Sequence, residues 1–436
     1  MKYISITLLI IPALLSAMSI DEAVQKTIMT NPQIDIKKEK LYTEQELLTA
    51  SKSDYLPSLD LSYSVGPEST KTINNKRERV DETRQEASVT LTQNIFAGFD
   101  TEYGVEQQKA LIISAGEGVK ETANSLAFET VTAYIDILKT KELLDIAKIN
   151  IEVHKKYLSQ IKEKVDAGVG RLSDYEQTLS RYENTRSTYL LNEQKYKNSF
   201  YNFQRILPGD IKISDLNKPD IGQLPAQDID ILVDMAFKNN PTIHLSQANI
   251  NYARATLDKS NAPYYPSVDL KAQSYWNKNL NGYSKDNQGR TFNNDDIEEN
   301  GYNALVVISY NIFNGLEDTS NIEANRHRLL QEQSTLVDSK RYIKADTKVA
   351  LEVFESTKQQ LVYIERNIEA SAKTVSYYQE ENELGRRSII DLLNIELEYN
   401  AAQNRRVTAE YNHLLAYYQI LTQTGKILET MSVTIE

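Results

Sequence analysis

The sequence predicts a mainly α-helical, internally duplicated protein with a smaller share of amphipathic β-strands. Three observations lead to this fold class: landmarks of the first half recur in order in the second, two helical segments keep an apolar period of 3.5 residues, and four short segments alternate apolar with polar residues. Each half is therefore expected to contain a helix, a hairpin of two strands, a very long helix, a tight turn and a further helix.

Residues 1–19 have the features of a secretory signal peptide. Lys2 precedes an apolar run that is too short to span a bilayer, and small residues at Ala17 and Ser19 favour cleavage after Ser19. The alternative is a buried N-terminal helix. No later segment offers about 20 uncharged apolar residues, so we expect an exported chain that enters a membrane, if at all, as strands.

The composition argues against several classes of function. The 436 residues include no cysteine and only four scattered histidines, so we expect no thiol catalysis, no metal site and no lipid-anchored cysteine. Lys and Arg number 49 against 61 Asp and Glu, with no basic cluster, so nucleic acid is not an expected partner. No catalytic constellation can be assembled, so we expect neither an enzyme nor a cofactor.

The duplication emerges when the sequence is slid along itself. An offset of 209 residues places Asn31, which precedes a proline, on Asn240, which does the same. An offset of 217 places Gly168 on Gly385, and the extra eight residues fall in the second hairpin. The expected organisation is a first repeat at 20–207, a linker at 208–228, a second repeat at 229–428 and a C-terminal tail at 429–436.

The longest helix of each half carries a coiled-coil seam. From Val119 to Val165, alternate steps of four and three residues visit fourteen positions, eleven of them apolar, and a matching seam runs from Leu336 to Tyr378. A period of 3.5 residues held this long indicates supercoiled partner helices rather than a globular core. His154 lies in the first seam, where a tolerated polar residue explains it more simply than a pH sensor.

The helix lengths add a geometric argument. Residues 99–165 would form a helix of roughly 100 Å, which nothing globular needs. Two shorter helices at 21–55 and 172–206 would match that length if they stacked end to end. We therefore expect a cylinder wall in which two half-length helices accompany one full-length helix.

Four segments show the two-residue period of β-strands. Leu59, Leu61 and Tyr63, for example, alternate with polar residues. The joining segments 66–86 and 273–303 are rich in Asn, Lys, Asp, Glu and Gly and are expected to be loops. The expected strands lie at about 57–66, 86–95, 266–276 and 302–312.

Strands of about ten residues with an apolar face and long polar loops fit an outer-membrane barrel. The alternative is a half-buried sheet on a soluble domain, but no further apolar segment could cover it. Four strands cannot close a barrel, so several chains must share one, and three copies give twelve strands. Aromatic residues at the helix–strand junctions are expected to form an interfacial belt in contact with lipid: Tyr55, Phe96, Tyr264, Tyr265 and Phe313.

Several motifs together carry a resemblance to a known family. They are the two Asn-Pro pairs, the junctions YLPSLDL and YYPSVDL, the strand ends NIFAG and NIFNG, and the tip motifs AGVGRLSDYEQ and ELGRRSIIDLLNIELEYNAA. Duplicated and in this order, they resemble the TolC family of outer-membrane channel proteins over essentially the whole mature chain. The missing lipobox cysteine favours the secretion and general-efflux branch.

The resemblance implies a homotrimer with a twelve-stranded barrel in a Gram-negative outer membrane, continued by a twelve-helix coiled-coil tunnel in the periplasm. It implies a passive exit duct of a tripartite export system, for type I protein secretion or multidrug efflux. The partners would be a periplasmic adaptor protein and an inner-membrane ABC or proton-driven pump that open the periplasmic tip. The alternative is a non-conducting coiled-coil stalk or adhesin anchored in the outer membrane.

The resemblance also places a constricted, acidic entrance at the helix tips. The position that carries over is Asp391, with Asp174 as its equivalent in the first repeat. Many relatives have a second Asp one turn later, where this chain has Asn394. The alternative for Asp174 is a structural role in capping or starting a helix.

Further tip residues are expected to shape and hold this entrance. Arg387 lies four residues before Asp391 and is expected to bridge to that carboxylate or to the paired tip at Ser173 and Asp174. The next candidates for the link are Arg386 or the cluster of Glu380, Glu381 and Glu383. Such a bridge would hold neighbouring hairpins together. Three turn glycines are expected to supply positive φ at the tips: Gly168, Gly170 and Gly385.

Overall fold

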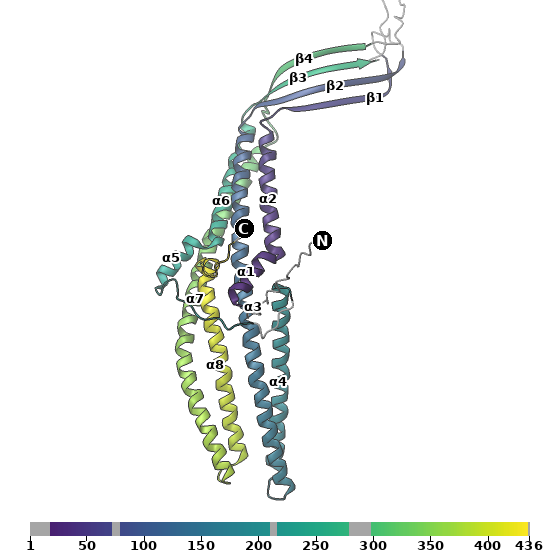
Figure 1. The fold of residues 1–436 in the computed structure, drawn as a ribbon. Helices are drawn as coiled ribbons and strands as arrows, with labels where there is room; N and C mark the ends of the chain where they lie inside the picture. Colours follow the sequence, from purple (N-terminus) through teal and green to yellow (C-terminus); the bar gives the residue numbers. More distant parts are fainter. Residues whose placement is uncertain (1–17, 72–78, 210–215, 279–297, 435–436) are drawn as a thin grey trace, which may run out of the picture. The chain divides into compact units, whose positions relative to one another are not determined.

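The computed structural model describes residues 18–71, 79–209, 216–278 and 298–434, so most of the predicted signal peptide lies outside the described residues. The described chain is mainly α-helical with one four-stranded antiparallel sheet, as predicted (Figure 1). No helix within these ranges has both the length and the apolar character needed to cross a bilayer.

The elements occur in the duplicated order that the sequence predicts. The first half contains α1 (Ile20–Thr30), α2 (Pro32–Ser53), β1 (Ser58–Thr70), β2 (Val80–Ala97), α3 (Asp100–Asp166) and α4 (Leu172–Ile206). The second half contains α5 (Ile229–Asn239), α6 (Pro241–Lys259), the 3-10 turn η2 (Ala262–Tyr264), β3 (Ser267–Lys278), β4 (Glu298–Ser309), α7 (Glu317–Glu383), α8 (Ile389–Gln423) and the short α9 (Ile427–Thr430). Helices α3 and α7 both have 67 residues, and α4 and α8 both have 35, so the long helical hairpins of the two repeats have equal helix lengths.

The chain divides into two compact units. The helical unit comprises Met1–Lys38, Glu117–Leu245 and Val337–Glu436. The sheet unit comprises Glu39–Gly116 and Ser246–Leu336, which hold the four strands and the helix segments next to them.

The first helix is shorter than the sequence predicts, because the Asn-Pro pair interrupts it. Asn31 has extended backbone angles, φ −83° and ψ 124°, and separates α1 from α2. Pro32 has no N–H to offer to the preceding turn, and proline disfavours helical angles in the residue before it. The prediction of one helix over 21–55 was therefore wrong, and α2 accounts for 22 of those residues.

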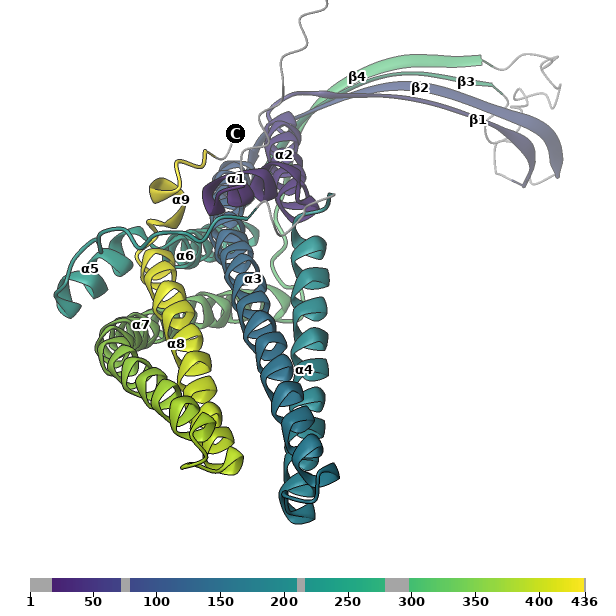
Figure 2. The ribbon, with the colours of Figure 1, turned by 60° about the horizontal axis from the view of Figure 1, so that its bottom comes forward.

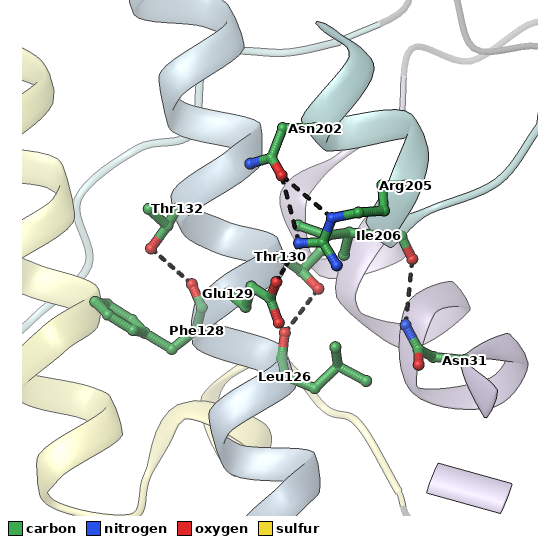
Figure 3. Close-up of polar contacts among 9 residues, drawn as sticks. All are labelled: Asn31, Leu126, Phe128, Glu129, Thr130, Thr132, Asn202, Arg205 and Ile206. Carbon is green, nitrogen blue, oxygen red and sulfur yellow. Dashed lines mark hydrogen bonds and ion pairs between the residues drawn. The ribbon is translucent and has the colours of Figure 1, made fainter. Parts of the chain in front are cut away.

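Each Asn-Pro pair joins the end of one half-length helix to the start of the next. Asn31 donates from Nδ2 to the carbonyl oxygen of Ile206, the last residue of α4, at 3.5 Å (Figure 3). In the second repeat, Asn240 donates in the same way to the carbonyl oxygen of Gln423 at 2.9 Å. Its Oδ1 also accepts from the backbone N–H of Thr242 at 2.9 Å and so caps α6. The motif therefore satisfies a free carbonyl and a free N–H at each joint.

The predicted seam of α3 is buried or half-buried at all fourteen positions. Ala123, Thr130 and Ile137 have no exposed surface. The main core combines this part of α3 with Phe203 of α4 and Leu421 of α8, so the supercoiled partners come from both repeats. Figures 1 and 2 show α3 beside α4 and α7 beside α8. The coiled-coil prediction is thereby confirmed for these helices.

The sheet is ordered β1-β2-β3-β4, which leaves β1 and β4 as its edges. Directly opposite residues share a face, and Leu59 is opposite Leu91, which is opposite Ala272, which is opposite Ala304. The neighbouring rows on the other face are polar, such as Ser62 opposite Ser88. The predicted alternation therefore produces one apolar and one polar face.

The strands extend further from the helices than predicted. β1 continues to Thr70 and β2 already begins at Val80, so the prediction that all of 66–86 is a loop was wrong. Polar cross-strand contacts support this part of the ladder, as when Ser64 donates to Glu86 Oε2 at 3.3 Å. In the second hairpin, β3 likewise continues to Lys278 and β4 begins at Glu298, so part of the predicted loop 273–303 is also strand.

At its other end β4 stops at Ser309, short of the predicted 312. The Oδ1 atom of Asn311 accepts from the backbone N–H of Phe313 at 3.1 Å and forms a turn that leaves the strand direction. The equivalent residue of the first repeat, Asn94, stays in β2 because β3 pairs with it and Asp269 accepts its side-chain N–H at 2.8 Å.

Candidate functional site

Glycines shape the tips of the two long helical hairpins in two ways, by adopting positive φ and by allowing close approach of the backbone. Gly168 and Gly385 have φ of 76° and 72°, as predicted for turn glycines. Gly170 does not have positive φ, contrary to the prediction. A Cβ atom there would lie 2.8 Å from the backbone nitrogen of Val165, so this position needs glycine for close approach.

The two predicted entrance carboxylates lie in the first turns of α8 and α4. Ser388 caps α8: its Oγ accepts from the N–H of Asp391 at 3.1 Å and donates to Asp391 Oδ2 at 2.8 Å. Asp174 accepts from Ser173 Oγ at 3.4 Å, and the cap residue of α4, Arg171, makes no side-chain capping bond. Asp174 is therefore not the cap of α4, and both carboxylates lie where a helix dipole favours negative charge.

The structure pairs Arg387 differently from the prediction. Its Nε lies 2.8 Å from Glu381 Oε2, and its guanidinium lies over the ring of Tyr378 at 4.2 Å. The hydrogen bond that Arg387 donates to the Glu381 carboxylate is the main cause that raises the pKa of Arg387, while Asp391 adds a smaller Coulombic effect. Arg387 thus stabilises its own hairpin, and the predicted direct pair with Asp391 is not formed. Arg386 is exposed.

A contact that sequence reasoning missed joins the two hairpins of the chain. Arg181 of α4 donates from Nη2 to Oδ1 of Asn394 of α8 at 2.8 Å. Asn394 stands where the family resemblance places a second Asp in many relatives, and its amide oxygen accepts from a charged donor without adding a negative charge. The only sequence signal was this departure from the family pattern, since the partner is 213 residues away.

Next to this contact, α3, α4, α7 and α8 share a small core. Its buried residues are Tyr157, Ile161, Ile389, Leu392 and Leu393. Tyr157 Oη donates to Glu396 Oε1 at 3.4 Å, and Gln379 Nε2 donates to both, at 3.4 and 3.5 Å. Glu396 is only 8 % exposed, and burial raises its pKa. The two hairpins therefore meet through an apolar cluster with a buried polar group at its edge.

His154 is fully buried in the α3 seam and precedes Tyr157 of this small core by three residues. Its Nδ1 lies 3.0 Å from the carbonyl oxygen of Asn150, and its Nε2 has no hydrogen-bond partner within the described ranges. Burial lowers the pKa of His154, and the nearby charge of Arg181 lowers it further. A neutral ring accommodated in the seam agrees with the simpler of the two interpretations.

The predicted belt aromatics lie at the ends of the strands. Tyr55, Tyr264, Tyr265 and Phe313 are exposed, and Phe96 is half-buried. Exposed aromatic rings at a helix–strand junction suit a boundary between lipid and water.

A further aromatic residue, Phe99, organises this junction and was missed. Its ring packs edge-on against Phe96 at 5.1 Å and Tyr265 at 5.3 Å. Phe99 and the preceding Gly98 have φ of 68° and 64°, a conformation that only glycine adopts without cost. A Cβ on Gly98 would collide with the carbonyl oxygen of Ala262, so the aromatic cluster depends on that glycine.

Comparison with known families decides what kind of protein carries these features. The model of the outer membrane efflux protein family matches residues 23–208 and 232–426, which are the two repeats. The chain belongs to the outer membrane efflux protein family. It is therefore an outer-membrane protein, and both the predicted TolC-family membership and the predicted localisation are confirmed. Because this family consists of channel proteins, the prediction that the chain is not an enzyme is also confirmed.

Several members of the efflux family are similar to this chain along most of their length. The outer membrane efflux protein BepC of Brucella suis is 20 % identical over 414 residues, which cover 93 % of this chain and 85 % of BepC. TolC of Escherichia coli is 20 % identical over 426 residues, covering 96 % and 84 %. The proteases secretion protein PrtF of Dickeya chrysanthemi is 18 % identical over 399 residues, covering 88 % and 83 %.

Solved structures of this family have the same fold. The CmeC outer membrane channel of Campylobacter jejuni has a TM-score of 0.79 at 13 % identity, with 93 % of this chain and 85 % of CmeC covered. The MtrE channel of Neisseria gonorrhoeae has a TM-score of 0.74 at 12 % identity, with 94 % and 89 % covered. The duplicated helix–hairpin–helix unit is thus the fold of an outer-membrane channel.

Proposed function

We propose that three copies of this chain form a passive exit duct that crosses the outer membrane and continues through the periplasm. In this proposal the four-stranded sheets combine into one twelve-stranded barrel, and the helices form a twelve-helix tunnel. A periplasmic adaptor and an inner-membrane ABC or proton-driven pump open the duct at its periplasmic tip. Family membership supports this assignment.

The observation that carries the proposal is the incomplete sheet. Within the described ranges, the edge strands β1 and β4 have no neighbour on their outer sides, and the apolar face is open, with Leu61 79 % and Ile308 70 % exposed. Unpaired edges are not tolerated in hydrocarbon. Pairing β4 of one chain with β1 of the next removes every edge only if the sheets close into a ring. Three copies give twelve strands, an even number that is wide enough to leave a lumen.

The helical unit supports the same assembly. Helix α7 has exposed residues at Tyr342, Val349 and Tyr363, which lie on one side of the helix. Together with the half-buried Ser356 they are spaced seven residues apart. A stripe of this period suits a supercoiled neighbour. Because the apolar residues of the α7 seam are already buried or half-buried within the chain, the exposed stripe is available for a second copy.

For the entrance, we propose that Asp391 and Asp174 form an acidic ring at the tips, while Arg181 and Asn394 hold the hairpins of one chain together. Arg386, being exposed, is the residue best placed to reach the tip of a neighbouring chain. A contact of this type is weak enough to yield when an adaptor engages the tips.

The cargo is proposed at the level of class only. Similarity to a proteases secretion protein and to an efflux protein supports type I protein secretion or multidrug efflux. Specificity would then lie in the pump and the adaptor, since a shared duct contacts its substrates weakly.

Mass measurement in detergent and single-channel recording test the proposal together. We expect a trimer that survives extraction and produces discrete conductance steps in planar bilayers. A monomer in detergent would refute the shared barrel. A trimer without conductance would favour the alternative, a non-conducting stalk.

A further inference from the structure

The turns that follow β2 and β4 have the same backbone conformation. After β2, Gly98 and Phe99 have φ of 64° and 68°. After β4, the equivalent residues Gly315 and Leu316 have φ of 74° and 70°. In both turns the backbone N–H four residues on donates to the second residue, at 2.9 Å for Phe99 and 3.1 Å for Leu316. Because bulky residues seldom adopt positive φ, the two junctions share an unusual turn.

The turn after β2 is covered by the segment that precedes β3. A Cβ on Gly98 would collide with the carbonyl oxygen of Ala262, which is itself buried. The ring of Phe99 packs edge-on against that of Tyr265 at 5.3 Å. The two segments meet because β2 and β3 pair antiparallel, so that the end of one strand lies beside the start of the next.

The turn after β4 has no such cover within the described part of the chain. A Cβ on Gly315 would meet no atom within 4 Å, so inside one chain only the positive φ opposes a side chain there. Leu316 is 65 % exposed, whereas its equivalent Phe99 is 40 % exposed. Phe313 is exposed as well, although its equivalent Phe96 is half-buried. The second junction therefore leaves an apolar surface open.

The opposite edge of the sheet, before β1, holds a segment equivalent to the cover (Figure 1). An offset of 209 residues places Ser53 on Ala262. The same offset places Leu56 on Tyr265. The same backbone hydrogen bond closes both turns, from Leu56 to Ser53 at 2.8 Å and between the equivalent pair before β3 at 3.0 Å. Ser53 and Leu56 are both exposed, so this segment has the conformation of a cover with nothing beneath it among the described residues.

We propose that the turn at Gly315 and Leu316 of one chain is covered by residues 53–56 of a second copy. The inference rests on the proposed duct, in which β4 of one chain pairs with β1 of the next. Antiparallel pairing there places the end of β4 beside the start of the neighbour's β1, as the end of β2 lies beside the start of β3. The Ser53 carbonyl of the second copy then closes over Gly315, and its Leu56 lies on Leu316. Each chain thus has one internal joint and shares a second joint of the same kind with its neighbour.

Cross-linking of paired cysteines tests this contact. The chain has no cysteine of its own, so Leu56→Cys/Leu316→Cys carries the only thiols. Treated with a short bismaleimide in detergent, this variant should give covalent dimers and trimers on a denaturing gel. Each single-cysteine variant should remain a monomer on the same gel, because one thiol per chain has no partner within reach at this joint.

Two further cysteine pairs are matched controls. Phe99→Cys/Tyr265→Cys places thiols at the equivalent joint inside one chain, so it should lose its free thiols and yet remain a monomer on the gel. Leu61→Cys/Leu316→Cys moves one thiol five residues along β1, a distance of about 17 Å, so it should not form covalent dimers.

The thermal dissociation of the trimer in detergent is a second measurement. Leu316→Asp should lower the dissociation temperature, because it places a charge in an apolar contact. Leu316→Phe should leave that temperature unchanged, because the first repeat has phenylalanine at the equivalent position, Phe99.

The possible failures are distinguishable. A wild-type trimer whose Leu56→Cys/Leu316→Cys variant forms no covalent dimer overturns this inference alone and leaves lipid as the cover of the turn. Equal dissociation temperatures for Leu316→Asp and Leu316→Phe also overturn it. A wild-type chain that is monomeric in detergent overturns the duct and the inference together.

Discussion

The contact between Arg181 and Asn394 offers the sharpest test of how the tips are held. Removing the amide by Asn394→Ala leaves the guanidinium without its 2.8 Å partner. A hydrogen bond to a charged donor contributes about 1.5–3 kcal/mol when shielded, but Asn394 is exposed, which reduces the value to about 1 kcal/mol. Three copies that open together would lose about 3 kcal/mol, which corresponds to about a hundredfold more open channels at rest.

The assay is the resting conductance of the purified channel in planar bilayers, measured for both single variants and the double variant. If the two side chains act through one contact, Arg181→Ala/Asn394→Ala should add little to either single change, with a coupling of about 1 kcal/mol per chain. Arg186→Ala is the control, because Arg186 pairs at 3.0 Å with Glu183 of its own helix.

Two results would refute this reasoning. Resting conductance that does not rise in Asn394→Ala would mean that the hairpins are held elsewhere, and additive effects of the two substitutions would mean that they act independently. A rise in the Arg186→Ala control would point to a general loss of helix stability instead.

Three further predictions concern stability. Gly98→Ala should destabilise the sheet unit by about 2 kcal/mol or more, whereas Gly315→Ala, with the same positive φ but open space around it, should cost about 1 kcal/mol, as measured by urea unfolding in detergent. Ile161→Lys should lower the yield of folded protein because it buries a charge, while Glu163→Lys, exposed on the same helix, should leave it unchanged; equal losses would contradict the seam. Burial raises the pKa of Glu396, so the folded state holds that proton more tightly and stability falls as pH rises from about 4.5 through the raised value. Glu396→Gln should flatten this part of the thermal-midpoint profile, and an unchanged profile would exclude the carboxyl as its source.

Much of the fold could be predicted because helices and strands follow periodic patterns of residues that are close in the sequence. The α3 seam repeats every 3.5 residues and the strands every two, and each pattern needs only neighbouring residues to be read. The duplication then multiplied the signal, since Asn31 and Asn240 occupy equivalent places and form the same pair of bonds. The error in the first helix arose because a local rule was not applied: Pro32 disfavours helical angles at Asn31 and so divides the helix.

The site was predicted less completely than the fold. The tip glycines and carboxylates could be placed because turn geometry and helix starts are local. The partner of Arg387 could not, because a cation four residues from Asp391 also lies six residues from Glu381, and only packing against Tyr378 decides between them.

The sequence by itself determined the two repeats, the lengths of α3 and α4, the two faces of each strand and the membership of an outer-membrane channel family. The tertiary structure alone decided that Arg181 meets Asn394, that Phe99 gathers the junction aromatics and that Glu68 and Glu82 share one level of the sheet. The physical reason is distance along the chain. Periodicity is set by residues a few positions apart, whereas a contact between residues from different elements exists only once the chain has packed.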